Sequence, residues 1–107
     1  MDKIIWTEPA LSDLDAIADY IALDKPDAAA RLVRRVFQHV ELLMNVPELG
    51  SRIPELRRNK RYRQIVEPPC RVFYRHEAES GRVYILGIMR GERLFRKDKI
   101  AERDKSE

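Results

Sequence analysis

The sequence predicts an α+β fold with the element order β-α-α-β-β-β, in which an antiparallel sheet packs one face against a two-helix hairpin. Two long stretches with helical apolar spacing fill the first half of the chain, and three short β-branched or aromatic runs follow in the second half. Each amphipathic surface must bury its apolar side, so both helices are expected on one face of one sheet. A chain of 107 residues has the usual size of a single domain.

The first half of the chain predicts a strand and two helices. Residues 4–7, Ile-Ile-Trp-Thr, are β-branched or aromatic, and the proline at position 9 suits the first turn of a helix. Apolar residues then recur every three or four positions, which predicts a helix over about 9–23. Residues 24–27, Asp-Lys-Pro-Asp, offer a capping side chain and an early proline, so a second helix should begin there and end before Pro47. The short connection predicts an antiparallel hairpin.

The second half predicts three successive antiparallel strands. They are expected over residues 61–66, 70–76 and 83–89, because turn-prone Glu-Pro-Pro and Glu-Ser-Gly triplets separate these runs. Together these elements are expected to form one domain over residues 1–95. Residues 96–107 are expected to be a charged C-terminal tail, a frayed helical piece that ends in disorder.

Side-chain alternation on the strands predicts a surface rich in arginine. Val72 and Tyr74 point to one face of the sheet, and their neighbours on the same strand point to the other. We expect the helices to cover the face of Val72 and Tyr74 and to leave the second face open. The expected open face carries Arg63, Arg71, Phe73 and Arg75.

Charge is distributed unevenly along the chain. The net charge is only +3, but residues 1–30 hold seven acidic and two basic side chains, whereas residues 52–75 hold eight basic and two acidic ones. The basic block is interrupted by aromatic residues and strand patterning, unlike a disordered basic tail. An anionic partner is therefore expected.

Several classes of site are excluded by composition. One cysteine, Cys70, and two distant histidines, His39 and His76, do not make a metal site, and scattered glycines form no phosphate-binding loop. We expect neither a metal nor another cofactor. A lone cysteine suits a reducing compartment, and the sequence shows neither a membrane-length apolar run nor a signal peptide. A cytoplasmic protein without a membrane partner is expected.

The motifs resemble the RelE/ParE superfamily of type II toxin–antitoxin toxins. The resembling stretches are Pro-Ala-Leu-Ser-Asp-Leu at 9–14, Gly-Ser-Arg-Ile-Pro-Glu-Leu-Arg at 50–57, Tyr-Arg at 62–63, Cys-Arg-Val-Phe-Tyr-Arg at 70–75 and Val-Tyr-Ile-Leu-Gly-Ile at 83–88. Together the resemblance covers roughly residues 3–95. It implies a toxin that a cognate antitoxin wraps with an acidic C-terminal segment. Contact with operator DNA is then expected only through the antitoxin.

The superfamily divides by target. RelE-like toxins cut mRNA on the ribosome without a metal, whereas ParE toxins inhibit DNA gyrase and have no nuclease residues. The resemblance places Arg63, Arg71 and Arg93 at basic positions of the nucleases, but Ile65 replaces a second lysine and no tyrosine follows Arg93. Neither histidine matches a catalytic position. Arginine transfers protons poorly near neutral pH, so the resemblance favours a ParE-like toxin that is not an enzyme.

Three functions follow from this resemblance. The leading one is a growth-inhibiting, plasmid-stabilising toxin that binds DNA gyrase and stalls it with its DNA cut. The second is a ribosome-dependent mRNA endonuclease that uses Arg63, Arg71 and Arg93 around the scissile phosphate. The third is an inactive toxin that acts only as an antitoxin-bound co-repressor. The side chains expected to face the target or the antitoxin are those of Arg63, Arg71, Phe73, Arg75, Arg90 and Arg93.

Overall fold

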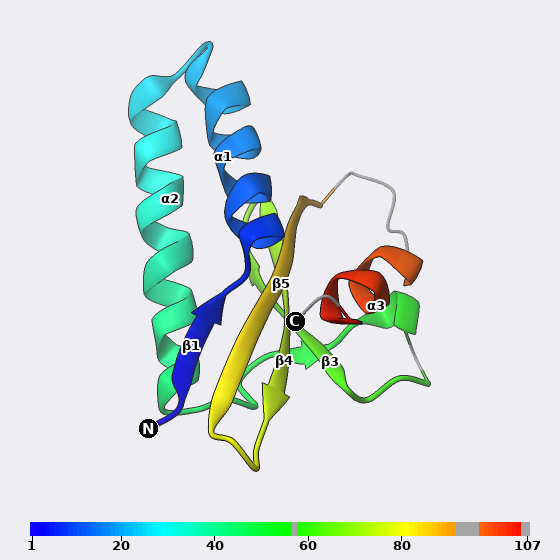
Figure 1. The fold of residues 1–107 in the computed structure, drawn as a ribbon. Helices are drawn as coiled ribbons and strands as arrows, with labels where there is room; N and C mark the ends of the chain where they lie inside the picture. The colour runs from blue at the N-terminus through cyan, green and yellow to red at the C-terminus, as the bar shows by residue number, and fades with distance from the viewer. Residues whose placement is uncertain (57, 92–96, 106–107) are drawn as a thin grey trace.

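The computed structural model describes residues 1–56, 58–91 and 97–105, and its sheet lies between a helical hairpin and a shorter helix (Figure 1). The strands are β1 (Lys3–Trp6), β2 (Ser51–Arg52), β3 (Tyr62–Glu67), β4 (Cys70–Glu77) and β5 (Arg82–Arg90). The helices are α1 (Glu8–Ala22), α2 (Pro26–Glu41) and α3 (Lys97–Lys105), with the short 3-10 helices η1 (Leu42–Met44) and η2 (Pro54–Leu56). Within this described part of the chain, no helix is both long and apolar enough to cross a membrane.

The strands lie in the order β1-β5-β4-β3-β2. The predicted element order and the two hairpins β3-β4 and β4-β5 are confirmed, and so is the α+β class. The sheet is mixed rather than wholly antiparallel, because β1 pairs in parallel with β5. The helical hairpin returns the chain to its starting end, which permits this parallel pairing between distant strands. The two-residue β2 was not predicted, since so short a strand has no alternation to read.

The two long helices begin differently. Thr7 is the N-cap of α1: its hydroxyl oxygen accepts a hydrogen bond from the backbone N–H of Ala10 at 3.4 Å and donates to the carbonyl of Ile85 at 2.7 Å. This hydroxyl therefore joins α1 to β5. The prediction of a capping side chain for α2 is wrong, because Lys25 occupies the N-cap position and has no acceptor oxygen. Pro26 begins α2 as expected.

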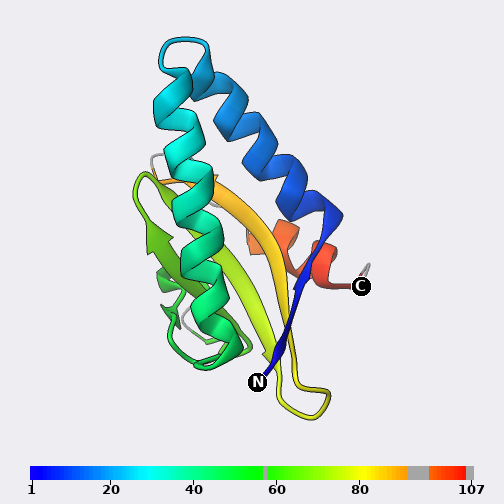
Figure 2. The ribbon, with the colours of Figure 1, turned by 90° about the vertical axis from the view of Figure 1, so that its left-hand side faces the viewer.

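The main core lies between the helical hairpin and one face of the sheet. Figure 2 shows α2 crossing in front of the strands. The fully or almost fully buried side chains of this core include Leu14, Leu32, Val36, Val40, Ile65, Val72, Tyr74, Val83 and Ile85. Trp6 and Phe37 close the side near β1, with ring centroids 4.8 Å apart. The predicted helix-covered face, that of Val72 and Tyr74, is confirmed.

The second face of the sheet is not open, and the prediction that it would be is wrong. The helix α3 packs across it on the opposite side from the hairpin (Figures 1 and 2). Ile100 of α3 is 4% exposed and joins Ile53, Tyr62, Phe73 and Leu86 in a second apolar cluster. One large apolar side chain, Ile100, in a charged nine-residue helix is a weak sequence signal, so the packing of α3 was missed.

A β-bulge in β5 shapes the surface under α3. Phe73 pairs with Gly87, whereas the next residue, Tyr74, pairs with Ile85, so Leu86 is an extra residue on β5. The bulge brings Gly87 beneath the guanidinium of Arg103, and a Cβ atom there would collide with that group. A side chain at this position would therefore displace the Arg103 guanidinium and disturb the contact between α3 and β5.

Candidate functional site

The Arg71 side chain lies on the second face of the sheet, as predicted, but it already holds a carboxylate. Its Nη1 and Nη2 atoms donate to Glu55 Oε2 at 3.0 Å and Oε1 at 2.7 Å, and its Nε atom donates to Gln64 Oε1 at 2.9 Å. The guanidinium carbon stands 5.0 Å from the centroid of the Phe73 ring. Hydrogen bonding from Arg71 lowers the pKa of Glu55, so this carboxyl is ionised near neutral pH.

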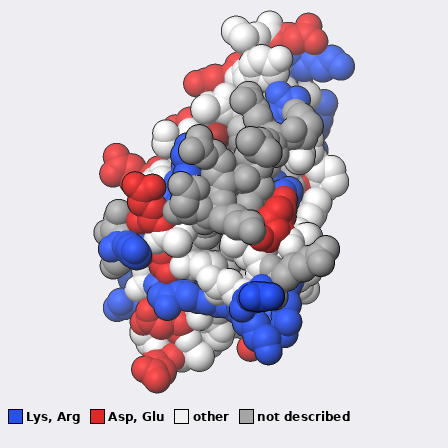
Figure 3. Space-filling model, turned by 90° about the vertical axis from the view of Figure 1, so that its right-hand side faces the viewer, with Lys and Arg blue, Asp and Glu red and all other residues white. Residues whose placement is uncertain are grey.

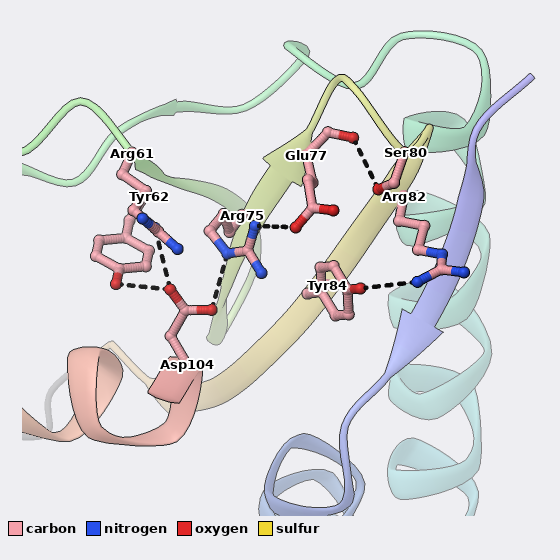
Figure 4. A network of polar contacts seen from close by, with 8 residues as sticks. All are labelled: Arg61, Tyr62, Arg75, Glu77, Ser80, Arg82, Tyr84 and Asp104. Carbon is pink, nitrogen blue, oxygen red and sulfur yellow. Dashed lines mark hydrogen bonds and ion pairs between the residues drawn. The ribbon is translucent and has the colours of Figure 1, made fainter. Parts of the chain in front are cut away.

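Arg75 is buried in a polar network under α3 (Figure 4). Its Nε donates to Asp104 Oδ1 at 2.8 Å, and its Nη1 donates to Glu77 Oε2 at 3.0 Å. The other Asp104 oxygen accepts from Arg61 Nε at 3.1 Å and from the Tyr62 hydroxyl at 2.9 Å. Burial opposes the charge of Arg75, but the hydrogen bonds with Asp104 and Glu77 outweigh it and raise its pKa.

Arg63 does not lie with the other predicted arginines. It pairs with Tyr74 across the β3-β4 ladder, which places it on the face that the helical hairpin covers. Its Nη1 donates to the carbonyl of Gly50 at 2.8 Å. The Tyr74 hydroxyl accepts from the backbone N–H of Gly50 at 2.9 Å and donates to Pro47 O at 2.8 Å. The predicted grouping of Arg63 with Arg71 and Arg75 is therefore wrong, and Arg63 helps to hold the 47–50 loop.

The remaining predicted site residues have different surroundings. Phe73 has no exposed surface, because α3 covers it, so it does not face solvent in this structure. The guanidinium carbon of Arg90 stands 5.1 Å from the centroid of the Tyr20 ring. Arg90 lines a groove of about 670 Å³ between α1, the end of β5 and α3. Arg93 lies outside the described residues.

Two charged residues that the sequence analysis missed, Asp13 and Arg103, line this groove. Asp13 of α1 accepts from the backbone N–H of Ile88 at 2.9 Å and from Arg103 Nη1 at 2.6 Å and Nη2 at 3.2 Å. Arg103 also donates to the carbonyl of Leu86 at 3.1 Å. The four-residue spacing of Ile100 and Asp104 was an available signal, since it puts an apolar and an acidic side chain on one face of a helix.

Both histidines are paired with acidic side chains. His39 Nδ1 of α2 is 3.2 Å from Glu67 Oε1, and Arg35 Nε donates to Glu67 Oε2 at 3.3 Å. His76 Nε2 is 2.7 Å from Asp2 Oδ2. His76 pairs with Val83 near the end of β4, on the face away from Arg71. Among the described residues, no group of three or more His, Cys, Asp and Glu side chains could hold a metal ion.

The surface around α3 carries charges of both signs. Figure 3 shows this side of the molecule, with Lys and Arg side chains gathered on its lower part and Asp and Glu side chains among them. The basic block is therefore partly neutralised by two carboxylates, Glu55 within the block and Asp104 of α3. Such a surface binds by matched charge and shape more readily than by general attraction to a polyanion.

Residues 4–95 match the profile of the family described as "ParE toxin of type II toxin-antitoxin system, parDE". The chain is 34% identical over 94 residues to "Toxin RelE2" of Caulobacter vibrioides, a match that covers 88% of this chain and 100% of the relative. Among solved structures, the chromosomal ParDE system from P. aeruginosa superposes with a TM-score of 0.70 at 26% identity and covers 86% of this chain and 98% of that one.

A second structural neighbour is the RelBE2 toxin–antitoxin complex from Mycobacterium tuberculosis, with a TM-score of 0.56 at 21% identity over 83% of this chain and 96% of that one. This likeness shows the shared fold. The family match spans the helical hairpin and the strands β2 to β5, so it includes Glu55, Arg71 and Arg75. The chain belongs to the ParE toxin family, within the RelE/ParE superfamily of type II toxin–antitoxin toxins.

Proposed function

We propose that this toxin inhibits DNA gyrase in the cytoplasm and that a cognate antitoxin neutralises it. The observation that supports gyrase over mRNA is the internal pairing of the predicted phosphate-binding arginines. Arg71 binds Glu55 in a bidentate contact, and Arg63 binds the carbonyl of Gly50. These two guanidinium groups also lie on opposite faces of the sheet. They do not converge on one phosphate in this arrangement.

Proton transfer gives a second argument. RNA cleavage through the 2′-hydroxyl needs a base and an acid, and general acid–base catalysis contributes roughly a hundred- to ten-thousand-fold in rate. His39 is engaged with Glu67 and His76 with Asp2. His76 lies on the face of the sheet away from Arg71, and His39 belongs to α2, which covers that same face, so neither is placed to transfer a proton at Arg71. A toxin that poisons its target by binding has no need of an acid–base couple.

The alternative is a ribosome-dependent mRNA endonuclease. The name of the relative "Toxin RelE2" and the RelBE2 neighbour favour it. Arg63, Arg71 and Arg93 would then have to assemble around the phosphate on the ribosome. An inactive toxin that acts as a co-repressor with its antitoxin is the third possibility, and loss of both activities would favour it.

The surface proposed to face the target or the antitoxin includes Arg71 and the groove beside Arg90. Arg71 is 14% exposed at its side chain, and Arg90 lines the groove together with Tyr20. Phe73 and Arg75 would reach a partner only if α3 moved, since both are buried beneath it. Contact with operator DNA is proposed to occur through the antitoxin.

The experiment adds the purified toxin at matched concentrations to a gyrase supercoiling assay and to a translating extract. We expect loss of supercoiling or trapped cleaved DNA, and no new mRNA ends by primer extension. Arg71→Gln is expected to weaken gyrase inhibition, whereas Arg82→Gln, an exposed charge-matched control at the other end of the sheet, is not. Codon-phased cuts in ribosome-bound mRNA, with gyrase unaffected, would establish the endonuclease instead.

A further inference from the structure

Arg71 holds Glu55 in the geometry with which arginine recognises carboxylates on other molecules. Two parallel N–H···O contacts of 3.0 and 2.7 Å join the guanidinium to both oxygens of one carboxylate. Such bidentate pairs give directional specificity as well as energy. Gln64 accepts from the remaining Nε–H at 2.9 Å and fixes the guanidinium plane. Arg71 is therefore already oriented to bind a carboxylate, and in this structure the carboxylate of Glu55 occupies that site.

Arg71 and Glu55 differ in how strongly the surrounding structure fixes their positions. Arg71 belongs to the interior strand β4, its side chain is 14% exposed, and it lies against Phe73. Glu55 belongs to the three-residue helix η2 beside the two-residue edge strand β2, and its side chain is 36% exposed. Short surface elements open locally at little cost. Glu55 is accordingly the replaceable half of the contact.

A hollow beside the pair has room for a partner. It measures about 420 Å³ and is lined by Pro54, Glu55, Gln64, Val66, Pro68 and Arg71, among others. Val66 is 50% exposed and offers apolar surface next to the charged group. A peptide that places a carboxylate on Arg71 could set a small apolar side chain against Val66.

We propose that Arg71, oriented by Gln64, binds a carboxylate of an acidic partner peptide, and that this carboxylate displaces Glu55. The charge of the surrounding sequence supports an acidic occupant, since residues 52–75 hold eight basic and two acidic side chains, of which Glu55 is one. Glu55 then acts as an internal competitor that lowers the affinity for weakly acidic partners. The inference rests on the proposed function only in that the peptide would come from the neutralising antitoxin.

The test uses the full-length chain labelled with ¹⁵N and follows the Nε–H signal of Arg71. The probes are the peptide acetyl-Glu-Val-Glu-amide, inorganic phosphate and a short single-stranded RNA. Glu55→Gln is expected to bind the peptide roughly tenfold more tightly than the unsubstituted chain, because an internal competitor at millimolar effective concentration has been removed. The Arg71 signal should shift saturably, and the double variant Glu55→Gln/Arg71→Gln should lose binding.

A matched control separates this effect from a general change in charge. Glu77→Gln also removes one carboxylate from a buried arginine, but Arg75 keeps its contact with Asp104, so no receptor is opened. Its affinity for the peptide should equal that of the unsubstituted chain. Glu55→Asp keeps the charge but shortens the reach, and it should bind with intermediate affinity. Circular dichroism spectra identical to that of the unsubstituted chain are required of each variant.

Three results would overturn the proposal. They are equal peptide affinity in Glu55→Gln and the unsubstituted chain, peptide binding that persists in the double variant, and tighter binding of phosphate or RNA than of the peptide at Arg71. The last result would assign the site to nucleotide phosphates. None of these measurements depends on toxicity, so they test peptide binding at Arg71 even if the toxin does not inhibit gyrase.

Discussion

Asp104, three residues before the end of the sequence, accepts a 2.8 Å hydrogen bond from Arg75 in the middle of the sheet, and both side chains are less than a tenth exposed. The same carboxylate accepts from Arg61 and Tyr62 on the neighbouring segment. One acidic side chain thus connects α3 to β3 and β4. The helix α3 is held in place by this contact together with Ile100.

Replacing Asp104 with asparagine should loosen α3. The change keeps the shape but removes the charge that three donors share, and a hydrogen bond to a charged group contributes about 1.5–3 kcal/mol. We expect the amide protons of α3 to exchange with solvent at least tenfold faster, measured by hydrogen exchange. Lys105→Gln, at an exposed position of the same helix, is the control and should exchange as before. Unchanged protection in Asp104→Asn would show that Ile100 alone holds the helix.

Gly87→Ala should destabilise the protein. The added methyl group collides with the Arg103 guanidinium and lies 3.3 Å from Asp13 Oδ2, so the ion pair between α1 and α3 must shift. Inserting a methyl group into a packed site costs typically about 1–3 kcal/mol, measurable as a lower midpoint of urea unfolding. Gly91→Ala is the matched control, since its nearest neighbour would be 3.6 Å away at Pro69 O. Equal midpoints for the two variants would contradict the close approach at Gly87.

Tyr74→Phe should cost about 1–3 kcal/mol of stability, because it leaves the backbone N–H of Gly50 and the carbonyl of Pro47 without their hydroxyl partner. The 47–50 loop should become more sensitive to limited proteolysis. Tyr20→Phe, at a position that is 60% exposed, should leave both the unfolding midpoint and the cleavage rate unchanged. Should the two variants behave alike, the hydroxyl of Tyr74 does not anchor the loop.

Stability should fall as the pH rises above about 10. Burial raises the pKa of Tyr74, and burial together with the hydrogen bond to Asp104 raises the pKa of Tyr62. Both phenols therefore lose their protons at lower pH in the unfolded chain than in the folded one. Their contribution is fully present below the ordinary tyrosine pKa of about 10 and is lost as the pH rises through the folded-state values.

Urea unfolding between pH 8 and 11 measures this loss. In Tyr74→Phe the free energy of unfolding should fall less steeply with pH than in the unsubstituted chain. Only one of the two tyrosines whose ionisation favours unfolding then remains. Absorbance of tyrosinate, compared between these two proteins, should place the ionisation of Tyr74 above the ordinary range. An identical pH slope in both proteins would exclude Tyr74 as a source of the effect.

Periodicity in the sequence determined the order of the elements and most of their bounds. The helix expected over about 9–23 is α1 (Glu8–Ala22), and the strand expected over 70–76 is β4 (Cys70–Glu77). These features are local, since a repeat of two or of three to four residues already fixes which side chains share a face. The motifs that indicated a RelE/ParE toxin were local as well, and the family match over residues 4–95 confirms them.

The face of the sheet on which Arg63 lies was decided by tertiary structure. Its pairing with Tyr74 is a matter of strand register, which alternation within a single strand does not give. Ile65 could have indicated the correct face from the sequence. It lies on the same face as Arg63 and is 4% exposed in the main core. An apolar residue two positions along should have placed Arg63 toward the helices.

The partners of the remaining arginines were decided by tertiary structure alone. Glu55 is 16 residues from Arg71 in sequence, and Asp104 is 29 residues from Arg75. Composition shows an excess of basic charge between residues 52 and 75, but charge that is counted along a chain contains no information about which carboxylate each arginine meets in space. Because ion pairing acts over a few ångströms of space, the sequence determined that the sheet is rich in arginine, and only the fold decided that Glu55 and Asp104 neutralise it.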